Sequence, residues 1–404
     1  MLFDSARHEP LLPIAWDEHR VRATIARIAR DIEDRFSEDA YWPLHPLDVE
    51  DGDDPNLPAT TLYGGACGVI WALHYLEAAG AIALARNYTS DLESLLTRNR
   101  TWLRSVGSRE FASYLGGDLP ILMLAFANTP TAELGECIAA LIAGNVENPA
   151  RELMWGSPGT MLAALFLYER TRQERWADLF RRSAAALWGQ RQWSPEHGCH
   201  YWTQDLYGRE STYLDGVHGF VATALVIIRG RALLGAESFA AWEECIVNTV
   251  ERTATWEGPL VNWRPELHVP SGRSKMLMQY CHGAPGFVVC LADLPGPALD
   301  RLLVAAGEAT WTAGPLVKGS NLCHGTGGNG YAFLKLYRRT GDSTWLARAR
   351  AFAMHGIAQT EAEERRQRRL RYSLWTGDAG FAIYLWECLR GSARFPTLDC
   401  FFAN

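Results

Sequence analysis

The stretch GVHGFVATALVIIRG, residues 216–230, joins a short glycine turn to a run of apolar, helix-forming residues. The same pattern of Gly-x-x-Gly followed by an apolar helical segment recurs along the whole chain. Its other copies begin at Gly65, Gly156, Gly283, Gly325 and Gly377, and a degenerate seventh copy is Gly117-Asp-Leu-Pro120. The proline of that copy suits the first turn of a helix. Repetition of this kind is typical of folds built from stacked helical units.

Amphipathic helices are expected between the apolar ones. Residues 172–190 and 342–358 carry apolar side chains at three- and four-residue spacing opposite arginines. Helices that are apolar all round need burial on every side, whereas amphipathic helices need one face in water. An inner ring of seven helices inside an outer ring of seven meets both requirements. We therefore expect an all-α fold, an α/α toroid, with residues 1–404 as one domain and all the glycine turns at one mouth.

A linear superhelical solenoid is the competing architecture. An open array needs polar terminal repeats, but the repeats near both ends of this chain are as apolar as the others, which favours closure. Two charged stretches, the acidic and proline-rich residues 43–58 and the run at 361–371, are expected to be surface segments. Arg371 and the arginines before it could guide acidic substrates to the mouth, but a solvated charged face is the expectation that we favour.

Composition excludes several classes of protein. The chain has 404 residues, of which 48% are hydrophobic and 21% charged, and this argues against disorder. The net charge is −7, without a basic stripe, which disfavours nucleic-acid binding. Neither a secretory leader nor a transmembrane stretch is recognisable. Nine cysteines spread through a long chain fit reduced thiols better than disulfides, so we expect a cytoplasmic protein.

Two of the glycine turns are preceded by Cys-His pairs, Cys281-His282 and Cys323-His324. If all turns meet at one mouth, the two pairs lie together there. Thiolates and imidazoles are the ligands that zinc prefers, and three of them with an open position are typical of a catalytic site. The residues alone thus suggest a zinc site made by both cysteines and one histidine. The alternative is a pair of buried structural cysteines beside turn histidines.

The sequence resembles the lanthionine synthetase C-like family, which includes the lantibiotic cyclases and the eukaryotic LanC-like proteins. The stretches that carry the resemblance are QYCHGAPG at 279–286, LVKGSNLCHGTGGNGYAFLKLYRRTGD at 316–342, ELMWGSPG at 152–159 and SLWTGDAG at 373–380. CHGAPG, the Lys-Gly before LCHG and the closing ARFP at 393–396 are similar to the eukaryotic-type branch. The resemblance implies an α/α toroid in which Cys281, Cys323 and His324 hold Zn²⁺.

The resemblance also implies a reaction, the addition of a thiol to dehydroalanine or dehydrobutyrine. His218 matches the family's catalytic histidine and would protonate the enolate. Glu152 would assist that transfer or orient His218; otherwise it is a first-turn glutamate that stabilises a helix dipole. Lys318 matches a lysine associated with glutathione, and its ammonium suits a carboxylate or a phosphate.

Three functions follow from this interpretation. The first is zinc-dependent addition of glutathione to a dehydroamino-acid-containing protein or peptide. The second is cyclisation of a lanthipeptide precursor through its own cysteine. The third, from another class, is a non-catalytic zinc protein that binds glutathione or a partner.

Two residues depart from the family pattern: Thr376 stands where eukaryotic-type relatives carry an acid, and Tyr280 where a tryptophan is common. An α/α-toroid glycosidase is disfavoured because no paired carboxylates are evident.

Overall fold

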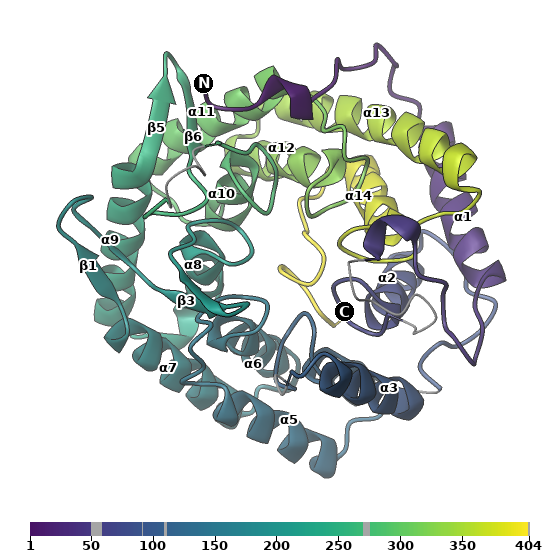
Figure 1. The fold of residues 1–404 in the computed structure, drawn as a ribbon, viewed down its shortest axis with the longest axis horizontal. Helices are drawn as coiled ribbons and strands as arrows, with labels where there is room; N and C mark the ends of the chain where they lie inside the picture. The colour runs from purple at the N-terminus through teal and green to yellow at the C-terminus, as the bar shows by residue number, and fades with distance from the viewer. Residues whose placement is uncertain (50–58, 91, 109–110, 270–274, 403–404) are drawn as a thin grey trace.

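The computed structural model describes residues 1–49, 59–90, 92–108, 111–269 and 275–402. Within these ranges fourteen α-helices alternate along the chain between an inner and an outer ring (Figure 1). The inner helices are α2 (Ala66–Ala78), α4 (Leu119–Asn128), α6 (Ser157–Thr171), α8 (Phe220–Arg229), α10 (Ala284–Leu291), α12 (Thr326–Thr340) and α14 (Asp378–Arg390). The outer helices are α1 (Glu18–Asp34), α3 (Leu92–Ser105), α5 (Ala132–Gly144), α7 (Glu174–Gly189), α9 (Ala236–Thr253), α11 (Pro297–Ala313) and α13 (Ser343–Gln367).

The burial of each ring follows its sequence pattern. In α8 every residue from Phe220 to Ile228 is buried, and in α10 the whole helix is buried. The outer helix α1 buries one stripe, which includes Val21, Ile25, Ile28 and Ile32 at three- and four-residue spacing. None of the helices in the described ranges combines the length and the hydropathy that a membrane span requires. The expected double ring of seven and seven helices is therefore confirmed.

Backbone hydrogen bonds between successive glycine turns close the ring. The amide of Trp375, before α14, donates to the carbonyl of Tyr63, before α2, at 3.0 Å. Tyr63 donates in turn to Leu115 at 3.0 Å, and Cys281 donates to Cys323 at 3.0 Å. Helix α14 also packs against both α1 and α2. The last unit thus joins the first, and the fold is a toroid rather than an open solenoid.

In five of the glycine turns the second glycine lies inside the first turn of the helix, whereas in the turn before α8 the second glycine is the N-cap. The first glycine is the N-cap of α2, α6, α10, α12 and α14. A Cβ on Gly328 would lie 1.9 Å from the carbonyl oxygen of Leu322, six residues earlier. The second glycine of four other turns would meet the carbonyl six residues earlier at 1.9–2.2 Å; these are Gly68, Gly159, Gly286 and Gly380. Only glycine allows this approach.

Three short antiparallel hairpins are additions that the sequence analysis did not predict. They pair β1 (Gln192–Ser194) with β2 (Cys199–Tyr201), β3 (Gln204–Leu206) with β4 (Arg209–Ser211), and β5 (Ala254–Glu257) with β6 (Leu260–Trp263). Each hairpin turns on a glycine with positive φ, at 63° in Gly198, 75° in Gly208 and 59° in Gly258. Three short 3-10 helices complete the described elements: η1 (Ser5–Arg7), η2 (Pro46–Asp48) and η3 (Arg231–Leu233).

The C-terminal segment after α14 runs into the centre of the ring (Figure 1). The ring of Phe395 stacks on that of Tyr280 at 4.9 Å and lies 5.5 Å from that of Trp375. The carboxylate of Asp399 accepts a hydrogen bond at 2.7 Å from the buried ammonium of Lys335. This segment therefore packs behind the turns that precede α10 and α14.

The charged run at 361–371 lies at the surface, as expected, and most of it is helical, because α13 continues to Gln367. Its carboxylates pair with arginines of the neighbouring helix α1. Glu361 accepts from Arg20 at 3.1 Å, and Glu364 pairs with Arg27. These ion pairs thus link the two outer helices α1 and α13.

Arg371 does not lie on the solvated face that was expected. Its side chain is 13% exposed and forms an ion pair with Asp48 of η2. Asp48 also accepts a hydrogen bond from the hydroxyl of Thr376 at 3.1 Å. Asp48 thus ties the acidic stretch to the turn before α14, while Leu47 and Val49 beside it are exposed, as expected of a surface segment. Residues 50–58 lie outside the described ranges.

Candidate active site

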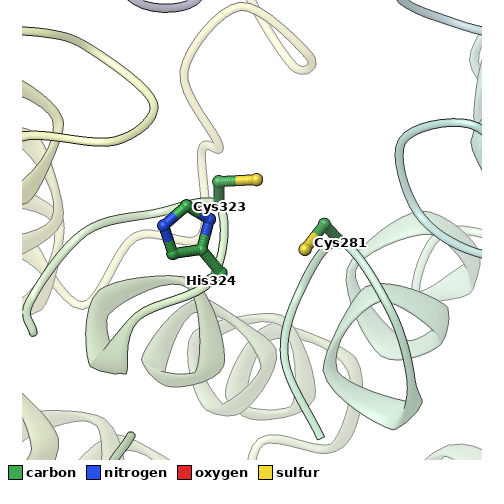
Figure 2. A group of neighbouring side chains, drawn as sticks. All are labelled: Cys281, Cys323 and His324. Carbon is green, nitrogen blue, oxygen red and sulfur yellow. The ribbon is translucent and has the colours of Figure 1, made fainter. Parts of the chain in front are cut away.

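Two buried cysteines and a half-buried histidine meet at the mouth of the ring. The ligand atoms of Cys281, Cys323 and His324 all lie within 4.8 Å of one another. Cys281 precedes α10 and Cys323 precedes α12, and the side chains approach one another from these separate turns (Figure 2). The hydrogen bond between the backbones of the two cysteines holds the turns together. Two thiols and one imidazole at this spacing suit the coordination chemistry of zinc.

Each sulfur atom also receives a hydrogen bond from a neighbouring side chain. The hydroxyl of Tyr63 donates to Cys323 Sγ at 3.0 Å, and the amide of Gln279 donates to Cys281 Sγ at 2.9 Å. Gln279 is held in turn by Arg7 of the N-terminal segment, whose guanidinium donates to Gln279 Oε1 at 3.0 Å. Neither Tyr63 nor Gln279 was predicted, because each reaches its cysteine only through the fold.

The two thiols are coupled to each other. A hydrogen bond from Cys281 holds the pKa of Cys323 well below its usual range, and the same bond, together with burial, raises the pKa of Cys281 well above it. Burial and the neighbouring Cys323 raise the pKa of Tyr63, so its hydroxyl keeps the proton that it donates. The hydrogen bonds from Cys281 and Tyr63 thus both favour the thiolate form of Cys323.

His218 and Glu152 form a close imidazole–carboxylate pair. Nδ1 of His218 lies 2.8 Å from Oε2 of Glu152, which is completely buried. Glu152 also accepts from the backbone amides of Met154 at 2.8 Å and Trp155 at 2.5 Å. It precedes α6 and is not in the first turn of that helix, so the helix-dipole alternative does not apply.

The surroundings of His218 favour its charged form. Burial lowers the pKa of this imidazole, but the hydrogen bond and charge of Glu152, with the charges of Asp215 and Cys323, outweigh burial and raise the pKa to about 9. The hydrogen bond and charge of Glu152 therefore favour the imidazolium form of His218 at neutral pH. Because Glu152 engages Nδ1, the proton available for transfer is the one on Nε2.

Asp215 is a functional candidate that the sequence analysis missed. Its Oδ2 accepts from Nδ1 of His282 at 2.7 Å. Its Oδ1 accepts from the backbone amides of Val217 at 2.9 Å and His218 at 2.8 Å. One buried carboxylate thus orients His282 and the turn that carries His218. Aspartate side chains often accept hydrogen bonds from the backbone amides two and three residues later in a turn. The sequence Asp215-Gly-Val-His218 could have been recognised as such a turn.

His282 follows Cys281 directly in the chain and lies beside the cysteine pair. It is directed to Asp215, and it is not part of the group formed by Cys281, Cys323 and His324. The ring of Tyr213 lies 5.8 Å from that of His218 and 6.0 Å from that of His282.

A cavity of about 870 Å³ opens beside His324, and Lys318, Arg371 and Thr376 contribute to its lining. Its size falls in the range of small-molecule sites, roughly 300 to 1,000 Å³. The structure therefore brings Lys318 to the same cavity as a candidate metal ligand. A second cavity, of about 640 Å³, is lined by Trp71 and Phe402 and by none of the predicted site residues.

The fold is a closed double ring of helices, an α/α toroid. Its glycine turns carry a Cys₂His cluster, which is a candidate metal centre, and an imidazole–carboxylate pair. The family model for lanthionine synthetase C-like proteins matches residues 54–400. The chain belongs to this family.

Relatives and a solved structure agree with this assignment. The chain is 33% identical over 162 residues to zebrafish (Danio rerio) glutathione S-transferase LANCL1, a match that covers 35% of this chain and 38% of that protein. It is 39% identical over 136 residues to the LanC-like protein GCL1 of Arabidopsis thaliana, over 30% of each chain. These matches thus span less than half of either relative. A solved structure of nisin cyclase superimposes with a TM-score of 0.63 at 15% identity, covering 89% of this chain and 94% of that one, and shows the shared fold.

Proposed function

We propose that the protein adds the thiol of glutathione to dehydroalanine or dehydrobutyrine in a protein or peptide, with zinc as its metal. The observation that carries the proposal is the cluster of Cys281, Cys323 and His324 at the mouth that also holds the pair of His218 and Glu152. The name of the zebrafish relative, glutathione S-transferase, supports a glutathione substrate.

The donor set decides which metal fits. Two buried thiols and an imidazole favour zinc over the oxygen-seeking Mg²⁺ and Ca²⁺. Zinc bound by these three side chains would lower the pKa of an incoming thiol, which near 8.5 would otherwise be mostly protonated at neutral pH. Tyr63 and Gln279 would hold the two cysteine sulfur atoms in place and withdraw negative charge from them.

The proposed reaction adds S–H across a carbon–carbon double bond. The thiolate sulfur forms a bond to the β-carbon of the dehydroamino acid, and the electron pair of the double bond moves onto the carbonyl as an enolate. His218 donates the proton on Nε2 to the α-carbon. The substrate thiol loses its proton to solvent when the thiolate forms. His218 later takes a proton back from solvent, so the protons balance. Glu152 holds Nδ1 of His218 throughout.

Lys318 is assigned to the binding of glutathione. Its ammonium lines the cavity that adjoins His324, so it can pair with a carboxylate of the tripeptide while the thiol reaches the metal site. We also propose that the protein is cytoplasmic, because all nine cysteines are unpaired in the described part of the chain.

The test incubates the protein with a dehydroalanine peptide and glutathione and measures the adduct by mass spectrometry. Wild-type protein is expected to form the thioether well above the uncatalysed rate. His218→Asn should lose about 100-fold or more of that acceleration, since general acid catalysis contributes about 10² to 10⁴. His200→Asn, a change on β2 at a residue that packs against Trp193, is the control. A peptide that carries its own cysteine should react only with added glutathione; ring closure without glutathione would instead support the cyclase. If wild-type protein accelerates neither reaction, a binding protein would be favoured.

A further inference from the structure

A second cluster of metal-ligating side chains lies in the segments that lead from α7 to α8 and from α9 to α10, and it shares no residue with the cluster of Cys281, Cys323 and His324. The ligand atoms of Glu196, His197 and His268 all lie within 4.8 Å of one another. The two imidazole rings have their centroids 5.5 Å apart. His197 is half-buried, and Glu196 and His268 are exposed, so a hydrated ion can reach the group. Neither the proposed reaction nor the family resemblance uses these residues.

The turn that carries Glu196 and His197 is fixed by its surroundings. It connects β1 to β2, and the pairing of Ser194 with Cys199 sets its ends. The amide of Gly198 donates to Ser194 O at 2.8 Å, and the carbonyl of Gly198 accepts from Asn248 of α9 at 3.0 Å. The hairpin is thus attached to an outer helix at its turn.

His268 comes from a separate segment, which is also fixed. Its backbone amide donates to Oγ1 of Thr212 at 3.0 Å, and the amide of Leu267 donates to Thr212 O at 2.8 Å. Its ring meets the ring of Tyr201 on β2 edge-on, with centroids 5.2 Å apart. Two segments about seventy residues apart in sequence therefore present their histidines to the same point.

We propose that Glu196, His197 and His268 form a second metal site, for a divalent first-row transition metal. Two imidazoles and one carboxylate suit Zn²⁺, Ni²⁺ or Cu²⁺, and the remaining coordination positions are left to water. Two nitrogen donors disfavour Mg²⁺ and Ca²⁺, which bind through oxygen. The site contains no sulfur, so its ligand set differs from that of the mouth.

Metal binding here would cross-link the β1–β2 turn to the segment around His268. That segment pairs with the strand that leads to the catalytic turn, because Leu214 donates to Pro265 O at 2.8 Å and Tyr213 bridges to Glu266. Asp215 and His218 follow directly along the chain. The cross-link would therefore stabilise the part of the scaffold that carries His218.

The experiment is equilibrium dialysis of the full chain against Zn²⁺, with zinc measured per chain in wild type, His197→Gln, His268→Gln and His200→Gln. His200 is the matched control, since it lies on the same hairpin and packs against Trp193 with ring centroids 4.9 Å apart. We expect His197→Gln and His268→Gln to bind one equivalent less than wild type, or to bind it at least about tenfold more weakly, and His200→Gln to match wild type. X-ray absorption of that equivalent should show nitrogen and oxygen neighbours only.

The difference between wild type and the two variants tests the site, whatever the mouth binds. If the mouth held no zinc, wild type would bind one equivalent less in total, and the difference would remain. Equal zinc content in all four proteins, or sulfur in the coordination shell of every bound zinc, would overturn the proposal. Equal loss in His200→Gln would also overturn it.

Discussion

Nδ1 of His218 lies 2.8 Å from Oε2 of Glu152, although the two residues are 66 positions apart in the chain. The carboxylate is completely buried and also binds two backbone amides of its own turn, so it cannot move away from the imidazole without losing these bonds. This pairing favours the charged form of His218 and leaves Nε2 outside the hydrogen bond. The ring thus brings an imidazole–carboxylate pair and a cluster of two cysteines and a histidine to one mouth.

The first prediction concerns the pH dependence of adduct formation. The pKa of His218 is raised to about 9, so the acid is present at neutral pH and is lost as the pH rises through that value. We expect the rate to fall on the alkaline side near pH 9. In Glu152→Gln the imidazole loses the negative charge that offsets the effect of burial, so the pKa of His218 should be lower. The alkaline fall in rate should then move to lower pH by on the order of one unit or more.

Glu169→Gln, at an exposed position on α6, is the control for this shift. The measurement is a pH–rate profile of thioether formation for the three proteins. An alkaline limb that stays in place in Glu152→Gln would show that His218 is not the titrating acid. The same pairing contributes to folding stability below the ordinary histidine pKa of about 6.5, and that contribution is lost as the pH rises through about 9.

The second prediction concerns Tyr63→Phe. This change removes the hydrogen bond to Cys323 Sγ and leaves the ring stacked beside Trp375. The sulfur then carries more negative charge, so bound zinc would activate a substrate thiol less well. We expect adduct formation to fall about tenfold or more, with the zinc content unchanged. Tyr168→Phe, near the C-terminal end of α6, is the control and should have no effect. An unchanged rate in Tyr63→Phe would contradict a role for the hydrogen bond to Cys323.

The third prediction concerns Lys318→Met. Loss of a charge-assisted hydrogen bond to a glutathione carboxylate costs roughly 1.5 to 3 kcal/mol, which corresponds to about a 10- to 100-fold higher KM for glutathione. The value of kcat should change little, because Lys318 does not touch the reacting atoms. Steady-state kinetics with varied glutathione measures both constants. Lys275→Met, at an exposed lysine paired with Asp4, is the control; an equal rise in KM there would argue against a specific contact.

The fourth prediction concerns the glycine turns. In Gly328→Ala the new methyl group would lie 1.9 Å from the carbonyl of Leu322, so the turn must shift. We expect the free energy of unfolding to fall by on the order of 3 kcal/mol. Gly189→Ala, at a helical position with no atom within 4 Å, should be neutral or stabilising. Chemical denaturation of both variants tests this contrast, and equal stabilities would refute the close-approach argument.

Much of the fold could be predicted because its determinants are local. Each apolar helix and its glycine turn are adjacent in sequence, so the count of seven units and the shared mouth followed from the repeat. Cys281 and Cys323 could be brought together with their adjacent histidines for the same reason, and the choice of His324 followed from the family resemblance. Closure of the ring depended on an argument about end repeats, which the hydrogen bond between Trp375 and Tyr63 confirms.

The remaining features depend on contacts that no local pattern records. The helical extension of α13 to Gln367 is stabilised by ion pairs with α1, more than 300 residues away. Arg371 is covered by Asp48 from the opposite end of the chain. Tyr63 and Gln279 reach the two sulfur atoms only when the ring is closed. Tyr280, a departure from the family pattern, packs against Phe395 of the C-terminal segment.

The most direct test of the central claim is removal and return of zinc, with thioether formation from glutathione and a dehydroalanine peptide as the readout. Protein dialysed against a strong chelator should lose adduct formation, and stoichiometric Zn²⁺ should restore it. Cys323→Ala should neither hold that zinc nor recover. A chelated, zinc-free protein that forms the thioether at the original rate would contradict the account.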